Sequence, residues 1–112
     1  MAKFVWLEWL WDWLRNTSSF EFEWDKGNTG KNLKHEVEDQ ESEEVFLDDH
    51  RFIFKDRVHS QGEERFRIIG KTKKNRLLFV AFTVRGKKIR VISARDINKK
   101  EVYLYEKKVS ST

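Results

Sequence analysis

The sequence predicts an α+β domain in which an antiparallel β-sheet has two N-terminal helices and a C-terminal helix packed on it. The second half of the chain contains four segments that alternate or run apolar as β-strands do, and short polar turns separate them. The first half and the C-terminus instead place apolar residues at helical spacing. A chain of 112 residues has room for one domain, and its 38% apolar residues can fill one core.

Composition excludes several kinds of protein. There is no cysteine, so a disulfide framework, a thiolate metal site and a cysteine nucleophile are all ruled out. No run of 18 apolar residues is present, so we expect no transmembrane helix, no membrane partner and a cytoplasmic location. His35, His50 and His59 lack the spacing of paired metal ligands, and we interpret them as surface or hydrogen-bonded residues. We therefore predict no metal and no cofactor.

Residues 1–19 form a tryptophan-rich N-terminal extension ahead of the sheet. Four tryptophans lie within eight consecutive positions, while Glu8, Asp12 and Arg15 fall on one face of a helix. A helix is therefore predicted, although three of the tryptophans also alternate as in a strand. Acidic residues on the polar face disfavour an anionic membrane surface. Packing onto the domain and self-association through residues 4–14 both stay open.

The next part of the chain predicts one strand and two short helices. Residues 20–24 alternate strictly between apolar and acidic side chains, which is the strand period. Residues 26–38 follow as a weak helix, because two glycines each lower its propensity by about 1 kcal/mol. Leu33 and Val37 are four residues apart and should both face the core. Residues 41–47 predict a second short helix with two adjacent apolar anchors.

The remaining strands are expected to form an antiparallel meander. They are predicted at residues 51–55, 64–70, 77–84 and 88–95. The third of these is apolar on both faces, which is typical of a central strand covered on both sides. In the last, alternation places Ile89, Val91 and Ser93 on one face. The connections are short enough for hairpins, so neighbouring strands should run antiparallel.

A C-terminal helix closes the predicted domain. Asn98 and Glu101 have the three-residue spacing of a capping box, which marks the start of a helix. Val102, Tyr105 and Val109 then form an apolar stripe along it. We therefore expect this helix to pack on the sheet through that stripe.

Charge is divided unevenly between the two halves of the chain. Residues 1–50 carry 5 Lys+Arg and 13 Asp+Glu, a net charge of −8, and residues 51–112 carry 18 and 6, a net charge of +12. Since most of the predicted strands lie in the second half, the sheet should be basic. A basic sheet favours a polyanion such as RNA or DNA as partner. The alternative is a solvated basic surface that the acidic half neutralises.

One constellation of side chains has the chemistry needed for metal-free RNA cleavage. Such cleavage requires a base for the 2′-hydroxyl proton, an acid for the leaving oxygen, and cations around the phosphorus. Arginine supplies permanently charged donors in a fork that matches phosphate oxygens. The alternative is that these are ordinary surface residues of a basic sheet. The candidates are Lys34, His35, Glu64, Arg65, Arg67, Arg85, Arg90 and Arg95.

An ordered series of short motifs resembles the BrnT family of toxins from type II toxin–antitoxin systems. The series runs from Phe22 to Tyr105, and its members occur in order at the family spacing. Three of these motifs are specific when taken together, although each alone is weak: Glu64-Arg65, Phe82-Thr83 with Arg85, and Ile89-Arg90-Val91-Ile92-Ser93-Ala94-Arg95. Lys34-His35 also matches the family. On this resemblance the toxin domain covers residues 20–109, and residues 110–112 are a polar tail.

The resemblance implies a RelE-like compact fold and an endoribonuclease that cleaves RNA and halts translation, and the residue types above predict that this cleavage is metal-independent. Lys34, His35 and Glu64 match family motifs, and our hypothesis is that His35 or Glu64 is the base and that His35 or Lys34 is the acid. The phosphate would be held by Arg65, Arg85 and Arg95, and RNA binding would also involve Arg67, Arg90, Ser93 and Tyr105. For Tyr105, stacking on a base and packing of the last helix are both open, and packing is preferred.

The resemblance also implies partners. It implies neutralisation by a BrnA-like antitoxin with a ribbon-helix-helix fold, and contact with operator DNA only through that antitoxin. An antitoxin should cover the basic sheet, because that both neutralises charge and blocks the substrate. The alternative function is a non-catalytic nucleic-acid-binding module or a protein-interaction module.

Overall fold

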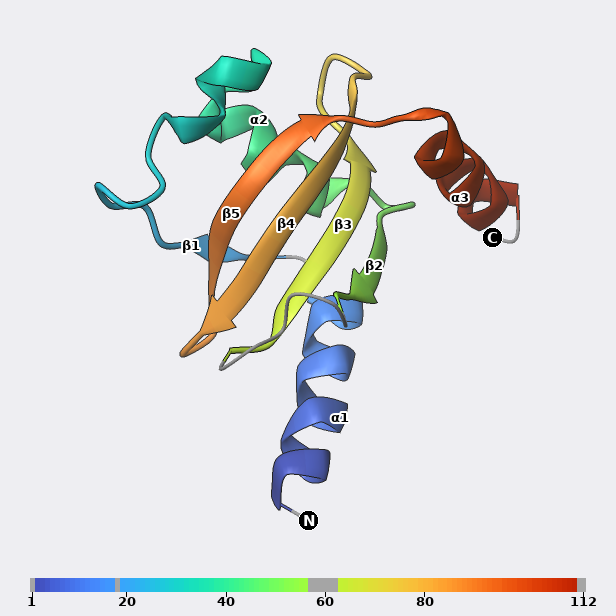
Figure 1. Ribbon diagram of the computed structural model, residues 1–112. Coiled ribbons are helices and arrows are strands. Elements are labelled where there is room, and N and C mark those ends of the chain that lie inside the picture. The colour runs from blue at the N-terminus through green and yellow to red at the C-terminus, as the bar shows by residue number, and fades with distance from the viewer. Residues whose placement is uncertain (1, 18, 57–62, 111–112) are drawn as a thin grey trace.

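The computed structural model describes residues 2–17, 19–56 and 63–110, with side chains from residue 9 onward. It has an α+β architecture with one five-stranded sheet (Figure 1). The helical elements are α1 (Ala2–Asn16), α2 (Asp39–Glu44), α3 (Lys99–Ser110) and the 3-10 helices η1 (Lys31–His35) and η2 (Val45–Leu47). The strands are β1 (Glu21–Phe22), β2 (Phe52–Lys55), β3 (Arg65–Lys71), β4 (Leu77–Arg85) and β5 (Lys88–Asp96).

The sheet is mixed, which corrects the expectation of a wholly antiparallel one. Its strand order is β1-β5-β4-β3-β2, and β2 to β5 form the predicted antiparallel meander. β1, however, pairs in parallel with β5. Hairpins force neighbouring strands to be antiparallel, but β1 and β5 are not joined by a hairpin. The chain leaves β1 at one edge, passes through η1, α2 and η2, and enters β2 at the opposite edge.

The main core lies on one face of the sheet, beneath α1 and the α2–η2 segment. β3 and β4 contribute Phe66 and Phe82, which are fully buried and stacked at 5.6 Å between ring centroids. The edge of the Trp11 ring packs on Phe66 at 5.6 Å, so α1 belongs to this layer. Helix residues Leu10, Leu14, Val45 and Phe46 complete the buried set. The last two are the anchors expected for the second short helix.

Among the residues that the structure describes, α3 covers one end of the opposite face. There Tyr105 packs with Ile69 and Phe79. In Figure 1 α3 lies beside the end of the sheet at which β5 finishes, α1 extends from the other end, and α2 lies behind the strands. β4 is buried on both faces, as predicted for the central strand. We call the side that carries Phe79 and α3 the open face.

The weak helix predicted at residues 26–38 is wrong in extent. Only η1 is helical, and it is bounded by left-handed backbone at Gly30 (φ 68°) and Glu36 (φ 60°). Such conformations interrupt an α-helix on both sides. Val37 is fully buried as expected, but Leu33 is 59% exposed because the short 3-10 turn directs it away from the core.

A β-bulge changes the faces of β5. Ala81 pairs with Ser93 and Phe82 pairs with Val91, so Ile92 is an extra residue in the strand. Ile89 and Val91 face the main core as predicted, but beyond the bulge it is Ala94 that does so. The expectation that Ser93 shares their face is therefore wrong. Ser93 lies on the open face.

Both terminal helices form where the sequence places them. Residues 2–16 are helical, so the alternating tryptophans do not make a strand. At α3, the amide N–H of Glu101 donates to the Asn98 side chain and the amide N–H of Asn98 donates to the Glu101 carboxylate, both at 3.0 Å, as a capping box requires. Tyr105 is buried, but Val109 is 38% exposed. In the described part of the chain, no helix has the length and apolarity needed to cross a membrane.

Candidate functional site

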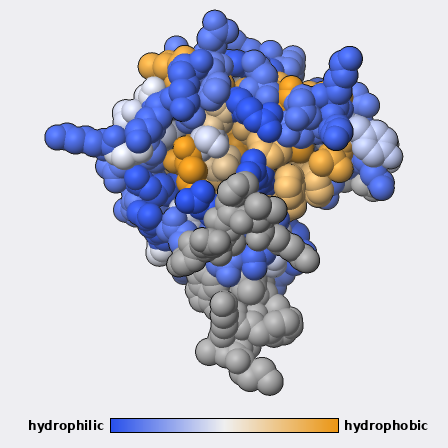
Figure 2. Space-filling view, viewed as in Figure 1, coloured by the Kyte–Doolittle hydropathy of each residue, from blue (hydrophilic) through white to orange (hydrophobic). Residues whose placement is uncertain are grey.

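The register of β3, β4 and β5 arranges the predicted basic residues in rows across the open face. Residues that are directly opposite in adjacent strands project to the same side of a sheet. The rows are Arg65–Thr83–Arg90, Arg67–Ala81–Ser93 and Ile69–Phe79–Arg95. From this side the surface is largely hydrophilic, and hydrophobic side chains gather toward α3 (Figure 2). With Arg85, two residues beyond Thr83 on the same side of β4, the structure brings six of the predicted residues onto one partly uncovered face.

Arg67 and Arg95 share the ring of Phe79. Their guanidinium carbons lie 4.9 and 4.4 Å from the ring centroid, within the range of a cation–π contact. Arg67 also bonds to Asp56, which is 7% exposed, with its Nε 2.9 Å from Oδ2. Arg95 forms a bidentate pair with Glu101 at 2.9 and 2.8 Å, and these bonds raise the pKa of Arg95. Each guanidinium is therefore oriented by a ring and a carboxylate.

Arg85 and Arg90 form a second cluster, at the β4–β5 hairpin end of the face. Arg90 donates to both carboxylate oxygens of Asp25 at 2.9 and 3.0 Å and to Glu23 at 3.1 Å. Hydrogen bonds from Arg90 hold the pKa of the Asp25 carboxyl below its usual value. Arg85 donates to Glu63 at 3.1 Å, and half of its side chain is exposed. Acidic residues of the N-terminal half thus neutralise part of the basic face.

Glu64 and Arg65 lie at the start of β3, near this second cluster. The Glu64 carboxylate is 2.9 Å from the ammonium of Lys55, and its main-chain oxygen accepts from the Thr83 hydroxyl at 2.7 Å. Arg65 is opposite Thr83 and so lies on the open face. The carboxylate predicted as a base is therefore an ion-pair partner of β2.

Lys34 and His35 occupy the end of η1, and both side chains are exposed. η1 is attached to β5, because the Asn32 side chain accepts from the amide N–H of Ala94 at 2.9 Å. The main-chain oxygen of His35 also accepts from Arg76, at 3.4 Å. The pair is therefore held near the end of β5, as expected on the solvent side of its helix.

The predicted acid–base residues are divided between the two ends of the sheet. Arg65, next to Glu64, pairs with Thr83, whereas Asp96, close to the His35 segment, pairs with Leu78. Five residues of a strand span about 17 Å. One phosphate cannot contact groups so far apart. Glu64 and His35 are therefore not brought together as a pair in this arrangement.

Tyr105 is a packing residue in the structure. Its side chain is 4% exposed, and its hydroxyl donates to Asp48 at 2.5 Å. Burial, followed by that hydrogen bond, raises the pKa of the phenol. A ring covered in this way is not presented for stacking on a base. The packing interpretation, which the sequence favoured, fits these contacts.

Sequence reasoning missed the residues that orient the arginines. Asp56, Phe79 and Arg76 were given no role, and Glu101 was recognised only as a helix cap. For Glu101 a signal was present, because an acidic residue at the start of a helix lies close to the end of the strand before it. His59 lies outside the described residues, as do Thr112 and its neighbour in the polar tail.

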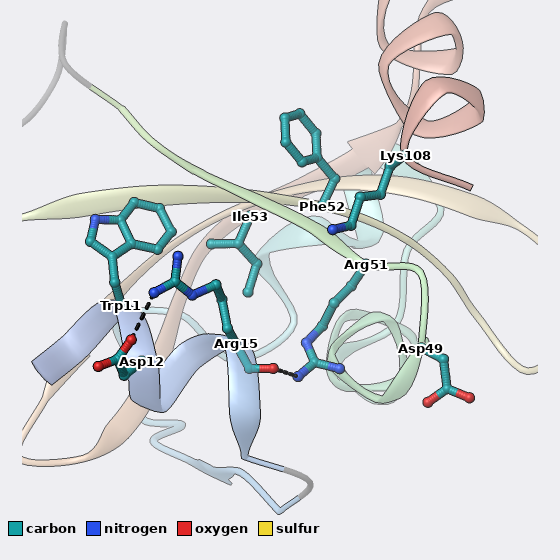
Figure 3. Close-up of a pocket in the computed structure, with 8 residues that line it drawn as sticks. All are labelled: Trp11, Asp12, Arg15, Asp49, Arg51, Phe52, Ile53 and Lys108. Atoms are coloured by element: carbon teal, nitrogen blue, oxygen red, sulfur yellow. Dashed lines mark hydrogen bonds and ion pairs between the residues drawn. The ribbon is translucent and has the colours of Figure 1, made fainter. Parts of the chain in front are cut away.

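A groove of about 770 Å³ lies apart from this face, between α1, β2 and α3 (Figure 3). Arg51 donates there to the main-chain oxygens of Leu14, Arg15 and Thr17, at 3.1 to 3.4 Å, and so satisfies the end of α1. None of the predicted site residues lines it. The lining residues are Trp11, Asp12, Arg15, Asp49, Arg51, Phe52, Ile53 and Lys108. The groove is thus a junction between α1, β2 and α3, separate from the predicted site residues.

A comparison with known protein families assigns the chain to a family. Residues 24–101 match the family described as "Ribonuclease toxin, BrnT, of type II toxin-antitoxin system". The chain belongs to the BrnT family. As a BrnT family member it is a ribonuclease toxin with a protein antitoxin and an RNA substrate. The match contains β2 to β5 and every predicted site residue except Tyr105, while α1 and most of α3 lie outside it. No curated protein matches the chain.

Proposed function

We propose that this BrnT family protein is a metal-independent endoribonuclease that binds RNA on the open face, cleaves it and thereby inhibits translation. The observation that carries the proposal is the set of arginines that β3, β4 and β5 project to one partly uncovered face. Arginine is the side chain best suited to bidentate hydrogen bonding with phosphate. The family description supports the activity, and the strand register supports its location.

Cleavage takes place at the end of this face where β5 finishes. Arg95 holds the scissile phosphate there, oriented by Glu101 and Phe79. His35 accepts the proton of the 2′-hydroxyl, whose oxygen attacks the phosphorus, and Lys34 protonates the departing 5′-oxygen. Cleavage of the P–O5′ bond leaves a 2′,3′-cyclic phosphate and a 5′-hydroxyl. The arginine stabilises the negative charge that builds on the phosphorane.

The second cluster binds the flanking RNA. Arg65 and Arg90 lie about 13 Å farther along the sheet, four residues down β4, and Arg85 lies about 20 Å away, six residues down. That spacing suits contacts with neighbouring phosphates of the same strand. Glu64 keeps Lys55 in place beside them. Ser93 and Arg67 lie between the two ends and complete the path.

The antitoxin is a BrnA-like ribbon-helix-helix protein that covers the same face. An acidic surface on it would neutralise the arginines and exclude RNA together. RNA and antitoxin therefore compete for the toxin. Operator DNA is contacted only through the antitoxin.

A panel of alanine variants separates binding from cutting. Arg95→Ala and His35→Ala should lower the cleavage rate about a hundredfold or more with little change in RNA affinity. Arg65→Ala and Arg85→Ala should instead weaken binding and reduce its salt dependence. The control is Lys74→Ala, an exposed lysine in the β3–β4 hairpin. If Arg95→Ala and His35→Ala both cut RNA at the wild-type rate, the location of the chemistry is wrong.

A non-catalytic nucleic-acid-binding module is the second candidate. It is favoured by one observation, namely that the carboxylate and imidazole predicted as bases lie at opposite ends of the sheet. A binding module would give salt-dependent RNA affinity and would leave the RNA intact. Recovery of cut RNA rejects it.

A further inference from the structure

We propose that Arg76 is a positioning residue that fixes the His35 segment relative to Arg95. The inference rests on the proposed function, because it takes His35 and Arg95 as the groups that act on the phosphate. Arg76 lies just before β4 and outside the open face. It contacts the predicted site residue His35 at the main-chain oxygen. It acts through the backbone of the loop that carries the imidazole.

The Arg76 guanidinium joins three elements. It donates to both carboxylate oxygens of Asp96, at 2.7 and 3.1 Å, at the end of β5. It donates to the Glu41 carboxylate of α2 at 3.2 and 3.3 Å. It also donates to the main-chain oxygens of Glu36, at 2.6 Å, and His35, at 3.4 Å. The bonds to Asp96 and, to a smaller extent, Glu41 raise the pKa of Arg76 above its usual value. The side chain is 26% exposed, so solvent competes only in part for these donors.

The segment held by Arg76 requires support. Glu36 has φ 60° and ψ 31°, the left-handed conformation that non-glycine residues rarely adopt. Such a residue persists where the surrounding structure holds it in place. The two carbonyl groups flanking this kink are the ones that accept from Arg76. The kink ends η1 immediately after Lys34 and His35, so it sets the direction in which they leave the fold.

Asp96 connects this clamp to the phosphate-binding arginine. Its carboxylate accepts from Arg76, while its main-chain oxygen accepts from Arg95 at 3.0 Å. Asp96 therefore binds both guanidinium groups, that of Arg76 through its carboxylate and that of Arg95 through its main-chain oxygen. Because Asn32 also bonds to Ala94, η1 is attached to β5 at two points. These contacts thus fix the segment that carries His35 relative to the strand that carries Arg95.

A lysine cannot replace this arginine. It would keep the positive charge, but a single ammonium cannot span two carboxylates and two carbonyls as a planar fork does. Arg76→Lys should therefore loosen the segment while it leaves the charge unchanged. Asp96→Asn provides a second variant, which keeps Arg76 and weakens only one of its partners. Lys74→Ala is the matched control, since it removes a cation from the same hairpin.

Two measurements on the full chain test the inference. The first needs no RNA: NMR should show changed chemical shifts for the His35 ring and faster amide exchange at Glu36 and Val37 in Arg76→Lys and Asp96→Asn, but not in Lys74→Ala. The second is a double-mutant cycle in RNA cleavage. Arg76→Lys should slow single-turnover cleavage about tenfold to a hundredfold at unchanged KM, and have a much smaller effect in a His35→Ala background, where only the placement of Lys34 can still be lost.

The outcomes separate this inference from the proposed function. If the wild-type chain does not cut RNA but the NMR changes occur, the proposed function fails and the clamp stands. If cleavage occurs, and Arg76→Lys leaves both the NMR signals of the His35 ring and the amide exchange rates as in the wild type, the inference is overturned. The inference is also overturned if Arg76→Lys lowers the cleavage rate by the same factor with and without His35, because that would indicate a general structural role.

Discussion

Glu101 is the residue whose replacement tests the architecture of the site most sharply. Its carboxylate is 8% exposed and accepts from both terminal nitrogens of Arg95 and from the main-chain and side-chain nitrogens of Asn98. Glu101→Gln keeps an oxygen that can cap α3 but loses the charge and one of the two Arg95 bonds. A hydrogen bond to a charged group contributes about 1.5–3 kcal/mol. Since Arg95 is 39% exposed, solvent screening places the loss in the lower half of this range, at about 2 kcal/mol.

Urea unfolding followed by circular dichroism measures the loss. With a slope of about 2 kcal/mol per molar urea, Glu101→Gln should lower the unfolding midpoint by about 1 M. Asn98→Ala is the matched control, because it removes the cap and leaves the ion pair, and it should cost about 1 kcal/mol. A Glu101→Gln midpoint within 0.2 M of the wild type, taken here as roughly the resolution of the assay, would refute the reasoning. So would a larger loss in Asn98→Ala.

Three further predictions concern other parts of the fold. Burial raises the pKa of Tyr105, so its contribution to stability is complete below the unfolded pKa of about 10 and is lost as pH rises above that value. In Tyr105→Phe the free energy of unfolding measured in urea should therefore fall less steeply with pH in that range, and an unchanged slope would contradict this. Leu14→Ala, at a fully buried position, should destabilise the protein by about 3 kcal/mol, whereas Leu33→Ala, at an exposed one, should change it by less than about 0.5 kcal/mol; similar losses in both would contradict the placement of the core. Trp9 is 42% exposed on α1, so if α1 mediates self-association, Trp9→Gln should lower the mass measured by light scattering at high concentration; equal masses would count against association through that part of the helix.

The strands of this fold could be predicted because their signal is local. Segments such as Arg65–Lys71 alternate by themselves, and the turns between them are short, so period and pairing follow from neighbouring residues. The parallel pairing of β1 could not be predicted in the same way, since its partner is more than 60 residues away. Two residues of strand carry too little pattern to specify a direction.

The faces of β5 show a different limit. The segment from Ile89 to Arg95 reads as a regular alternation, and nothing in its composition marks Ile92 as an extra residue. The bulge depends on how β5 fits against β4, which is a tertiary property. It moves Ser93 to the open face and Ala94 to the core. A single extra residue thus decided which side chains join the candidate site.

The site itself was predicted by residue type and not by arrangement. Arginines on alternate positions of strands predict a basic face. Which carboxylate pairs with each arginine depends on segments distant in sequence, as when Arg90 bonds to Asp25. The distance between Glu64 and the His35 segment likewise follows only from the register of the whole sheet. Residue type therefore predicted the chemistry, and the fold determined which of those residues can act together.

The most direct test of the central claim is cleavage of end-labelled RNA by the purified chain in EDTA, followed by identification of the product ends. The open-face account predicts 2′,3′-cyclic phosphate and 5′-hydroxyl ends with the wild type and with Lys74→Ala, and a loss of about a hundredfold or more with Arg95→Ala. Intact RNA in every lane, or equal cleavage by Arg95→Ala and the wild type, would contradict it.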